Sequence, residues 1–390
     1  MRPWVGFAAR QLHLANSFPP ATFRAFMRRE LLTIFALLVC IRAFAADWTL
    51  VKHDGRDYVS FDNVAQFYGL GGVQRVSSNA FSIAIGSRSL RGQAGSVELY
   101  INNLKFNLSY PVIEQSGHLC VSRMDLVKII EPVLRPGKIK DADMIDTIIL
   151  DPGHGGHDNG ATSIYGNEKT FTLDVANRAR MLFLQQGYKV YMTRTTDEFI
   201  PLEDRVRFAN RFPNALFISI HFNSGGAGTG LETYTLAPRG VPSMMADGPR
   251  ISDLQPCPGN GRDAENMALA TAAHASLVVH LKAFDRGMYD RGIKRARFVV
   301  IRDITIPGVL IEGGFLSNGY DARLIAMPEY RSGMAASIFQ AVQTYRRAVG
   351  PSALQFARSN TAPATASEPA STEAPAPAIT PAPAVPDAAN

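Results

Sequence analysis

The sequence predicts an α/β protein, with a twisted, mainly parallel sheet covered by helices on both faces and preceded by a small β-rich α+β domain. Two observations predict this fold. From Met144 onward, short apolar runs alternate with stretches of helical periodicity, which is typical of parallel strands joined by crossover helices. Before Lys140, short segments of alternating polarity are separated by turn signals such as Asn102-Asn103, which is typical of antiparallel strands.

The C-terminal pattern predicts six strands, at residues 144–150, 188–193, 215–220, 231–236, 297–302 and 308–311. The helix between the first two is predicted by apolar residues spaced i, i+4, i+7 and i+8, and it should end at Gly187. These residues are Val175, Ala179, Leu182 and Phe183. In sheets of this kind, functional sites gather beyond the carboxyl ends of the strands.

A weak internal repeat frames the N-terminal segments. The stretch GRDYVS at residues 55–60 is echoed by GHLCVS at residues 117–122, and each is followed by a short helical pattern. Ser60 and Ser122 therefore stand where helix N-caps are expected.

Residues 1–45 have the pattern of an export signal. The apolar run Leu31–Ile41 is too short to span a bilayer comfortably, two arginines precede it, and Ala43 and Ala45 supply the small residues that a signal peptidase requires. Met27 is an alternative start. The alternatives are an uncleaved membrane anchor or, less favoured, a lipoprotein acylated at Cys40.

The charge of the chain does not point to nucleic acid. Residues 1–45 hold six Arg and one Glu, so the formal net charge of +6 falls to +1 without them. Cys120 and Cys257 remain, and they either pair or stay free in the expected oxidising compartment. Residues 359–390 are mostly Ala, Pro, Thr and Ser, which predicts a disordered tail.

Reactive side chains follow three separated strands of the predicted sheet. His154 comes directly after the first strand in DPGHGG, His221 follows the ALFISI strand, and Glu312 ends the last strand in VLIEGGF. The carboxyl ends of these strands should share one edge, so we expect the three residues to lie together. Glu168 opens the first long helix, after a glycine-containing loop that returns over the same edge.

Two imidazoles and one carboxylate form the ligand set of hydrolytic zinc sites, which leave a fourth position for water. A further carboxylate is then needed to accept that water's proton. Taken singly, a His at a strand end is usually a surface or core residue, and a Glu at a helix start usually interacts with the helix dipole. Apolar strands are not expected to end in unpaired polar groups, because burying them costs free energy. The coincidence of four such residues favours a metal site.

A series of motifs in the C-terminal part resembles one known family, and the stretches occur in that family's order. They are ILDPGHGGHDNGA, NEKTFTLDVANR, GYKVYMTR, FIPLEDRVRFAN, ALFISIHFNS, GLETYTL, RGIKRARFVVIRD and PGVLIEGGFLSN. Residues 146–345 thus resemble the zinc-dependent N-acetylmuramoyl-L-alanine amidases, the Amidase_3 family of cell-wall hydrolases.

This resemblance implies that His154, Glu168 and His221 bind one zinc ion and that Glu312 is the essential carboxylate. It also implies cleavage of the amide between the lactyl group of N-acetylmuramic acid and the L-alanine of the stem peptide.

The remaining polar residues of these motifs have structural interpretations. Asp151 is expected to cap the glycine turn through backbone hydrogen bonds, and His157 is expected to be an exposed loop residue. Packing or hydrogen-bonding roles are expected for Arg194, Arg205 and Asn210. His274 and His280 are expected on the face of a helix over residues 263–283.

Two further segments depart from a bare catalytic domain. Residues 46–140 resemble the copper amine oxidase N-terminal-like domain, although His53 and His118 are isolated and predict no copper site. A spacer or wall-contact role is favoured for it. Between Thr235 and Asp263 lies a loop rich in Pro, Gly and Met. Some members of the amidase family that this chain resembles carry a regulatory helix in a comparable region that blocks the zinc, but the prolines here argue against a long helix. We expect the loop to shape the substrate groove.

The sequence therefore predicts an exported, zinc-dependent N-acetylmuramoyl-L-alanine amidase of the periplasm or cell envelope, acting on peptidoglycan or muropeptides. No nucleic-acid partner and no stable membrane span after signal cleavage are expected; a regulatory or wall-binding partner would act through residues 46–140. The predicted division is a signal peptide, an N-terminal domain, a catalytic domain and a tail, at residues 1–45, 46–140, 144–348 and 359–390. The alternatives are an inactive peptidoglycan-binding protein and a zinc hydrolase that cuts a different wall amide.

Overall fold

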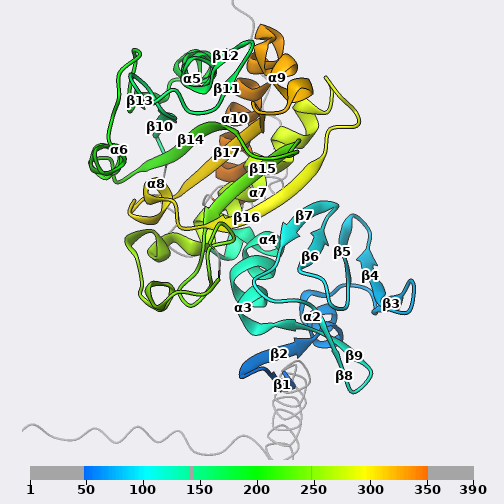
Figure 1. The fold of residues 1–390 in the computed structure, drawn as a ribbon. Coiled ribbons are helices and arrows are strands. Elements are labelled where there is room, and N and C mark those ends of the chain that lie inside the picture. The colour runs from blue at the N-terminus through cyan, green and yellow to red at the C-terminus, as the bar shows by residue number, and fades with distance from the viewer. Residues whose placement is uncertain (1–47, 140–144, 247, 350–390) are drawn as a thin grey trace, which may run out of the picture. The chain divides into compact units, whose positions relative to one another are not determined.

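The computed structural model describes residues 48–139, 145–246 and 248–349. The strands of the C-terminal part lie in the order β13-β10-β14-β17-β15-β16 (Figure 1). Their bounds are β10 (Thr147–Pro152), β13 (Lys189–Met192), β14 (Ala215–Asn223), β15 (Leu231–Leu236), β16 (Asp290–Ala296) and β17 (Gly308–Phe315). Neighbouring strands are parallel except β15 and β17, which are antiparallel. The mainly parallel sheet predicted from the sequence is confirmed.

Helices cover both faces of this sheet (Figure 1). On one face pack α5 (Glu168–Gln185), α7 (Asp263–Leu281), α9 (Gly319–Ala326) and α10 (Pro328–Val349), and on the other α6 (Leu202–Ala209) and α8 (Val299–Arg302). In β10, Ile148 and Leu150 belong to the first core and Ile149 to the second. Successive residues of a strand point to opposite faces of the sheet, so a continuous apolar strand contributes side chains to the cores on both faces.

One predicted strand is wrong. Residues 297–302 were expected to be extended, but the strand is β16, directly before them, and Val299–Arg302 forms the short helix α8. Val300 and Ile301 are consecutive and both buried, which a helical turn against the sheet allows and a half-exposed strand does not. The strand instead uses the mixed sequence DRGIKRA, which carries no apolar run.

The N-terminal part is antiparallel, as expected. Its strands are β1 (Leu50–His53), β2 (Arg56–Ser60), β3 (Gln74–Arg75), β4 (Ala80–Ile85), β5 (Arg88–Gln93), β6 (Glu98–Ile101), β7 (Leu104–Asn107), β8 (Ile113–Gln115) and β9 (His118–Ser122), and its helices include α2 (Phe61–Tyr68), α3 (Arg123–Asp125) and α4 (Glu131–Leu134). The two copies of the repeat form β2 and β9, which pair with each other. Both predicted N-caps are confirmed: Ser60 accepts from the Asn63 amide and Ser122 from the Asp125 amide.

The N-terminal and C-terminal parts share a sheet and a core. Strand β7 pairs with β16 through Phe106 and Ile293, and the order continues β16-β7-β6-β5-β4-β3. Met267, Ala270 and Ile293 are buried together with the apolar residues of the N-terminal part. The division into two domains stays a prediction.

Several sequence predictions fall outside the described residues. They are the signal at residues 1–45, the tail at 359–390 and the boundary between the two domains at 140–144. Among the helices that the structure describes, none is long and apolar enough to cross a membrane.

Candidate functional site

His154 stands on a turn that only small neighbours allow. It has a left-handed φ of 63° directly after β10. A Cβ on Gly153 would lie 2.2 Å from the His221 ring, and one on Gly160 would lie 2.5 Å from a Glu168 oxygen and 2.6 Å from the His154 ring. Glycines at these two positions therefore let the backbone come within contact distance of the three polar side chains.

His154, Glu168 and His221 converge on one point, as the sequence predicts. Their candidate ligand atoms all lie within 4.8 Å of one another. Glu168 Oε1 is 3.1 Å from His154 Nε2 and 3.0 Å from His221 Nδ1, and the two rings are 5.1 Å apart between centroids. The three residues come from the turn after β10, the start of α5 and the end of β14, so the fold and not local sequence brings them together.

Glu168 is fixed in place on both oxygens. Oε1 accepts from the Phe222 amide at 3.0 Å and Oε2 accepts from the Ala161 amide at 2.8 Å. Burial opposes ionisation of this carboxyl, but hydrogen bonds from His154 and His221 outweigh it and lower the pKa of Glu168 to about 2. Glu168 is therefore a charged carboxylate already held in a position where it could bind a metal.

Asp158 lies behind His154 and was missed in the sequence. Its Oδ2 is 2.9 Å from His154 Nδ1, which leaves Nε2 facing Glu168. Burial opposes ionisation of His154, but the carboxylates of Glu168 and Asp158 outweigh it and raise the pKa of the imidazole. A carboxylate behind a ligand histidine fixes its tautomer and ring orientation. The available signal was an acid four residues after the histidine in the same turn.

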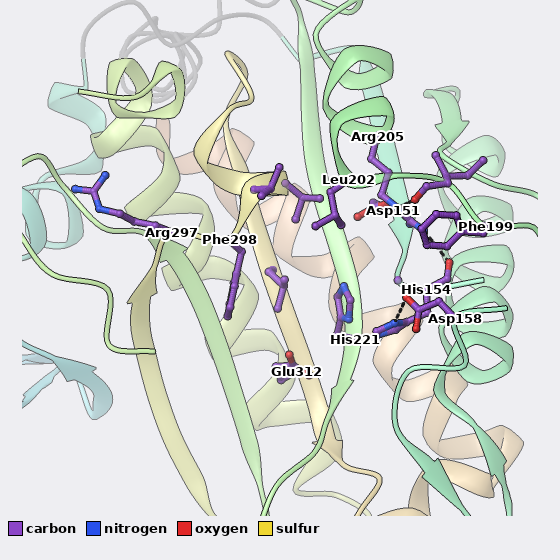
Figure 2. Close-up of a pocket in the computed structure, with 15 residues that line it drawn as sticks. Asp151, His154, Asp158, Phe199, Leu202, Arg205, His221, Arg297, Phe298 and Glu312 are labelled. Atoms are coloured by element: carbon purple, nitrogen blue, oxygen red, sulfur yellow. Dashed lines mark hydrogen bonds and ion pairs between the residues drawn. The ribbon is translucent and has the colours of Figure 1, made fainter. Parts of the chain in front are cut away.

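Glu312 lies next to this cluster in the sheet. It is paired in register with His221 on β14 and with Glu232 on β15, so the three side chains stand in a row on one face (Figure 2 shows His221 and Glu312). Glu312 is 8% exposed, and its Oε2 has no hydrogen-bond partner among the described residues. Burial and the negative charges of Glu168 and Glu232 hold the pKa of Glu312 well above its usual range. A buried carboxyl oxygen without a partner is poised for a proton or a substrate group.

Glu232 completes the row but is itself paired. It is 1% exposed and accepts from Arg291 at 2.6 Å and from Lys294 at 2.5 Å. Glu232 was not predicted from the sequence, although a carboxylate inside the apolar stretch LETYTL was a usable signal.

The predicted role of Asp151 is wrong. Its carboxylate does not cap the glycine turn; it accepts from the side chains of Arg205, Thr193 and Ser219 at 2.6 to 2.7 Å. Two arginines hold the turn instead. Arg194 donates to the carbonyls of Pro152 and Gly153, and Arg205 donates to those of Pro152 and His154. The long guanidinium side chains reach these carbonyls and donate hydrogen bonds to them. A charged carboxylate has no hydrogen to donate, so Asp151 cannot bond the same carbonyls.

The structural roles predicted for the other polar residues of the motifs are confirmed. His157 is exposed and stacks near Phe199, and Asn210 bonds the backbone of Thr305. His274 is fully buried on α7, between Thr233 at 3.0 Å and Asp290 at 2.8 Å. Cys120 and Cys257 are both free thiols.

A cavity of about 650 Å³ opens beside the cluster; we call it the metal cavity. His154, His221 and Glu312 line it together with apolar side chains of three segments (Figure 2). The apolar lining residues are Phe199, Ile200, Leu202, Phe298, Val299, Val300 and Leu310. Concave sites of this kind, mostly apolar with a few convergent polar groups, bind small molecules and short chain segments.

A comparison with known families identifies the motifs of the C-terminal part. The family model for N-acetylmuramoyl-L-alanine amidases (Amidase_3) matches residues 148–344, which is half of the chain and contains all four candidate residues. The chain belongs to this family. The resemblance found in the motifs is confirmed.

Relatives of this chain are found in several bacteria. The sporulation-specific N-acetylmuramoyl-L-alanine amidase of Bacillus subtilis is 32% identical over 190 residues, 48% of this chain and 63% of the relative. The N-acetylmuramoyl-L-alanine amidase AmiA of Escherichia coli is 28% identical over 245 residues, 58% of this chain and 84% of the relative. The catalytic domain of CwlV from Bacillus (Paenibacillus) polymyxa is 29% identical, with 52% of this chain and 98% of that chain covered and a TM-score of 0.42.

Proposed function

We propose that this chain is an exported zinc amidase that hydrolyses the amide between N-acetylmuramic acid and the L-alanine of the peptidoglycan stem peptide. The observation that carries the proposal is the convergence of His154, Glu168 and His221 beside Glu312, whose Oε2 has no hydrogen-bond partner in the part of the chain that the structure describes. Family membership and the amidase names of the relatives support the choice of substrate.

The donor set fits zinc. Two imidazole nitrogens and one carboxylate oxygen are ligands that hydrolytic zinc sites use, and a preformed trio leaves a further position open. His154, Glu168 and His221 would hold the ion, and Asp158 would orient His154 from behind. When bound, zinc supplies a Lewis acid that polarises the amide carbonyl and makes water more acidic.

Glu312 supplies the proton chemistry. It lines the metal cavity, and its free oxygen would accept the proton of the attacking water and pass it to the departing alanine nitrogen. A carboxyl with a raised pKa suits this exchange, because it takes up and releases a proton at an operating pH closer to neutrality. Apolar neighbours such as Phe298 and Leu310 limit the water that surrounds it.

The N-terminal part would contact the wall. It carries a cavity of about 430 Å³ lined by Arg56, Tyr110, Arg123 and Lys128, and the Arg56 guanidinium stacks 4.2 Å from the Tyr110 ring centroid. Aromatic and cationic side chains of this kind suit sugars and carboxylates. The periplasm or cell envelope is the compartment where such a substrate lies.

Mass spectrometry of digested sacculi tests the proposal. Intact stem peptides with free L-alanine amino termini should appear, should disappear after metal chelation and should return when zinc is added. Products cut at another amide would contradict the bond assignment. Binding of sacculi without any release of peptide would support the inactive, wall-binding alternative.

A further inference from the structure

The loop between β15 and α7 builds a second cavity next to the metal cavity. We call this space of about 460 Å³ the loop cavity. The loop, residues 237–262, contributes nine lining residues, and three more come from the chain after β16. The loop residues are Ser243, Met245, Ala246, Arg250, Ser252, Asp253, Gln255, Pro256 and Cys257, and the others are Arg297, Phe298 and Arg302. Arg297 and Phe298 also line the metal cavity, so the two spaces share a wall.

Arg297 fixes the loop as a wall. Its side chain is 11% exposed, forms an ion pair with Asp253 at 3.1 Å and donates to the carbonyls of Pro238 and Asp253. Figure 2 shows Arg297 pointing away from His221, whereas its neighbour Phe298 reaches toward the space between His221 and Glu312. The same short segment therefore holds the loop with one side chain and borders the metal cavity with the next.

The loop cavity carries an unbalanced positive charge among the described residues. Three arginines and one carboxylate line it. Asp253 pairs with Arg297, and Arg302 is held by Asp303, which lies 2.8 Å from its Nε. Burial raises the pKa of the Cys257 thiol, so that group adds no negative charge at neutral pH. Arg250 is exposed on the loop and has no ion pair with any described residue, which leaves its guanidinium to face a ligand.

We propose that the loop cavity is a subsite for the stem peptide beyond the scissile amide, in which Arg250 binds the first free carboxylate, the α-carboxylate of the D-glutamyl residue that follows L-alanine. This inference rests on the proposed function. The glycan strand of peptidoglycan carries no charge between its lactyl groups, whereas the stem peptide is acidic, so a cationic cavity selects the peptide side of the substrate. The guanidinium fork matches a carboxylate in geometry as well as in charge.

The apolar part of the lining agrees with this assignment. Met245, Pro256 and Phe298 offer surfaces for the aliphatic parts of a peptide. Arg250 lines the loop cavity and is not among the residues that line the metal cavity, so it acts on specificity and not on the chemical step.

Binding to two matched ligands tests the subsite. MurNAc-L-Ala-D-Glu and MurNAc-L-Ala-D-isoglutamine differ only in whether this α-carboxylate is free or amidated. Their affinities would be measured by isothermal titration calorimetry on the full, zinc-loaded chain carrying Glu312→Gln to prevent turnover. The matched control is Arg180→Gln, which removes the same charge from an exposed position on α5 outside both cavities.

The Glu312→Gln protein with Arg250 intact, here called the parent, should bind MurNAc-L-Ala-D-Glu about threefold to tenfold more tightly than the amidated ligand. This is the range for one charge-assisted contact at a partly exposed site. Arg250→Gln should abolish this preference, and Arg180→Gln should keep it. Equal affinity for acid and amide in the parent, or a preference that survives Arg250→Gln, would overturn the subsite. The readout does not need turnover: an acid preference in a chain that releases no peptide from sacculi would refute the proposed function and leave the subsite standing.

Discussion

Gly153→Ala tests whether close approach of the backbone to the ligand ring holds the metal site together. The added Cβ would lie 2.2 Å from His221 Cε1 and 2.6 Å from both ring nitrogens. Carbon atoms in ordinary contact lie about 3.5–4 Å apart. The His221 ring and the new Cβ must therefore move apart by more than about 1 Å to reach that distance.

The backbone at Gly153 cannot supply that movement easily. Its N–H donates to the Ile220 carbonyl at 3.0 Å, and its carbonyl accepts from Arg194 at 2.8 Å and from Thr172 at 3.0 Å. The imidazole of His221 is therefore the group that shifts. Metal sites tolerate displacements of only about 0.2 Å in ligand distance, so the variant would lose one of the three proposed ligands.

The loss should be large. Removing an outer-shell partner alone weakens metal binding by about 10-fold to 100-fold, so displacing a ligand should cost at least about 100-fold, or ~2.7 kcal/mol. Overpacking should lower the unfolding free energy of the metal-free protein by only about 1–3 kcal/mol. Zinc competition with a chromophoric chelator measures the affinity, and circular dichroism confirms the fold.

Gly319→Ala is the matched control, because a Cβ there meets nothing within 4 Å and the residue opens helix α9. It should leave the affinity unchanged. Zinc binding in folded Gly153→Ala within about twofold of wild type would refute the reasoning, since that change is below about 0.5 kcal/mol.

Four further predictions concern the site residues and their partners. Asp158→Asn should weaken zinc binding about 10-fold to 100-fold, because the neutral amide orients His154 less strongly; unchanged affinity in the same competition assay would contradict this. Arg205→Met leaves the buried Asp151 carboxylate without its cation, so urea titration should show a loss of ~3–5 kcal/mol, and a loss below about 1 kcal/mol would argue against it. The lowered pKa of Asp151 gives wild type stability that is present above the unfolded pKa of about 4 and is lost as pH falls through the folded pKa. The raised pKa of Glu312 has the opposite effect on the unfolding free energy. The metal-free fold loses stability as pH rises above the unfolded pKa of about 4.3. Glu312→Gln should therefore be more stable than wild type at neutral pH and equally stable at pH ~4.

The sequence could predict that His154, His221 and Glu312 lie together because one rule connects them. Parallel strands carry their ends to one edge, and His154, His221 and Glu312 each follow an apolar strand that needed no polar residue there. The same logic could not find the partners of Asp151. Arg205 and Ser219 lie 54 and 68 residues away, and nothing in the local pattern pairs them with it.

The segment around residues 290–302 shows a different limit. The apolar run FVVIR predicted a strand. In the structure the strand that pairs with β15 is DRGIKRA, and most of the apolar run forms helix α8, which packs against the sheet. Tertiary packing overrides local pattern there. The loop cavity could not be predicted from the sequence either. Residues 237–262 have no periodicity, and the residue that holds them, Arg297, comes after α7 and β16 in the chain.

Amide cleavage by the zinc-loaded Glu312→Gln variant tests the central claim most directly. The substitution keeps the shape of the side chain and removes its ability to accept a proton. We predict that the variant binds zinc as wild type does and that its turnover of a defined muropeptide falls by about 10²-fold to 10⁴-fold, the usual contribution of a general base. Turnover within about tenfold of wild type, with zinc bound and the stem peptide released with a free L-alanine amino terminus, would show that Glu312 does not carry the proton and would contradict this account of the site.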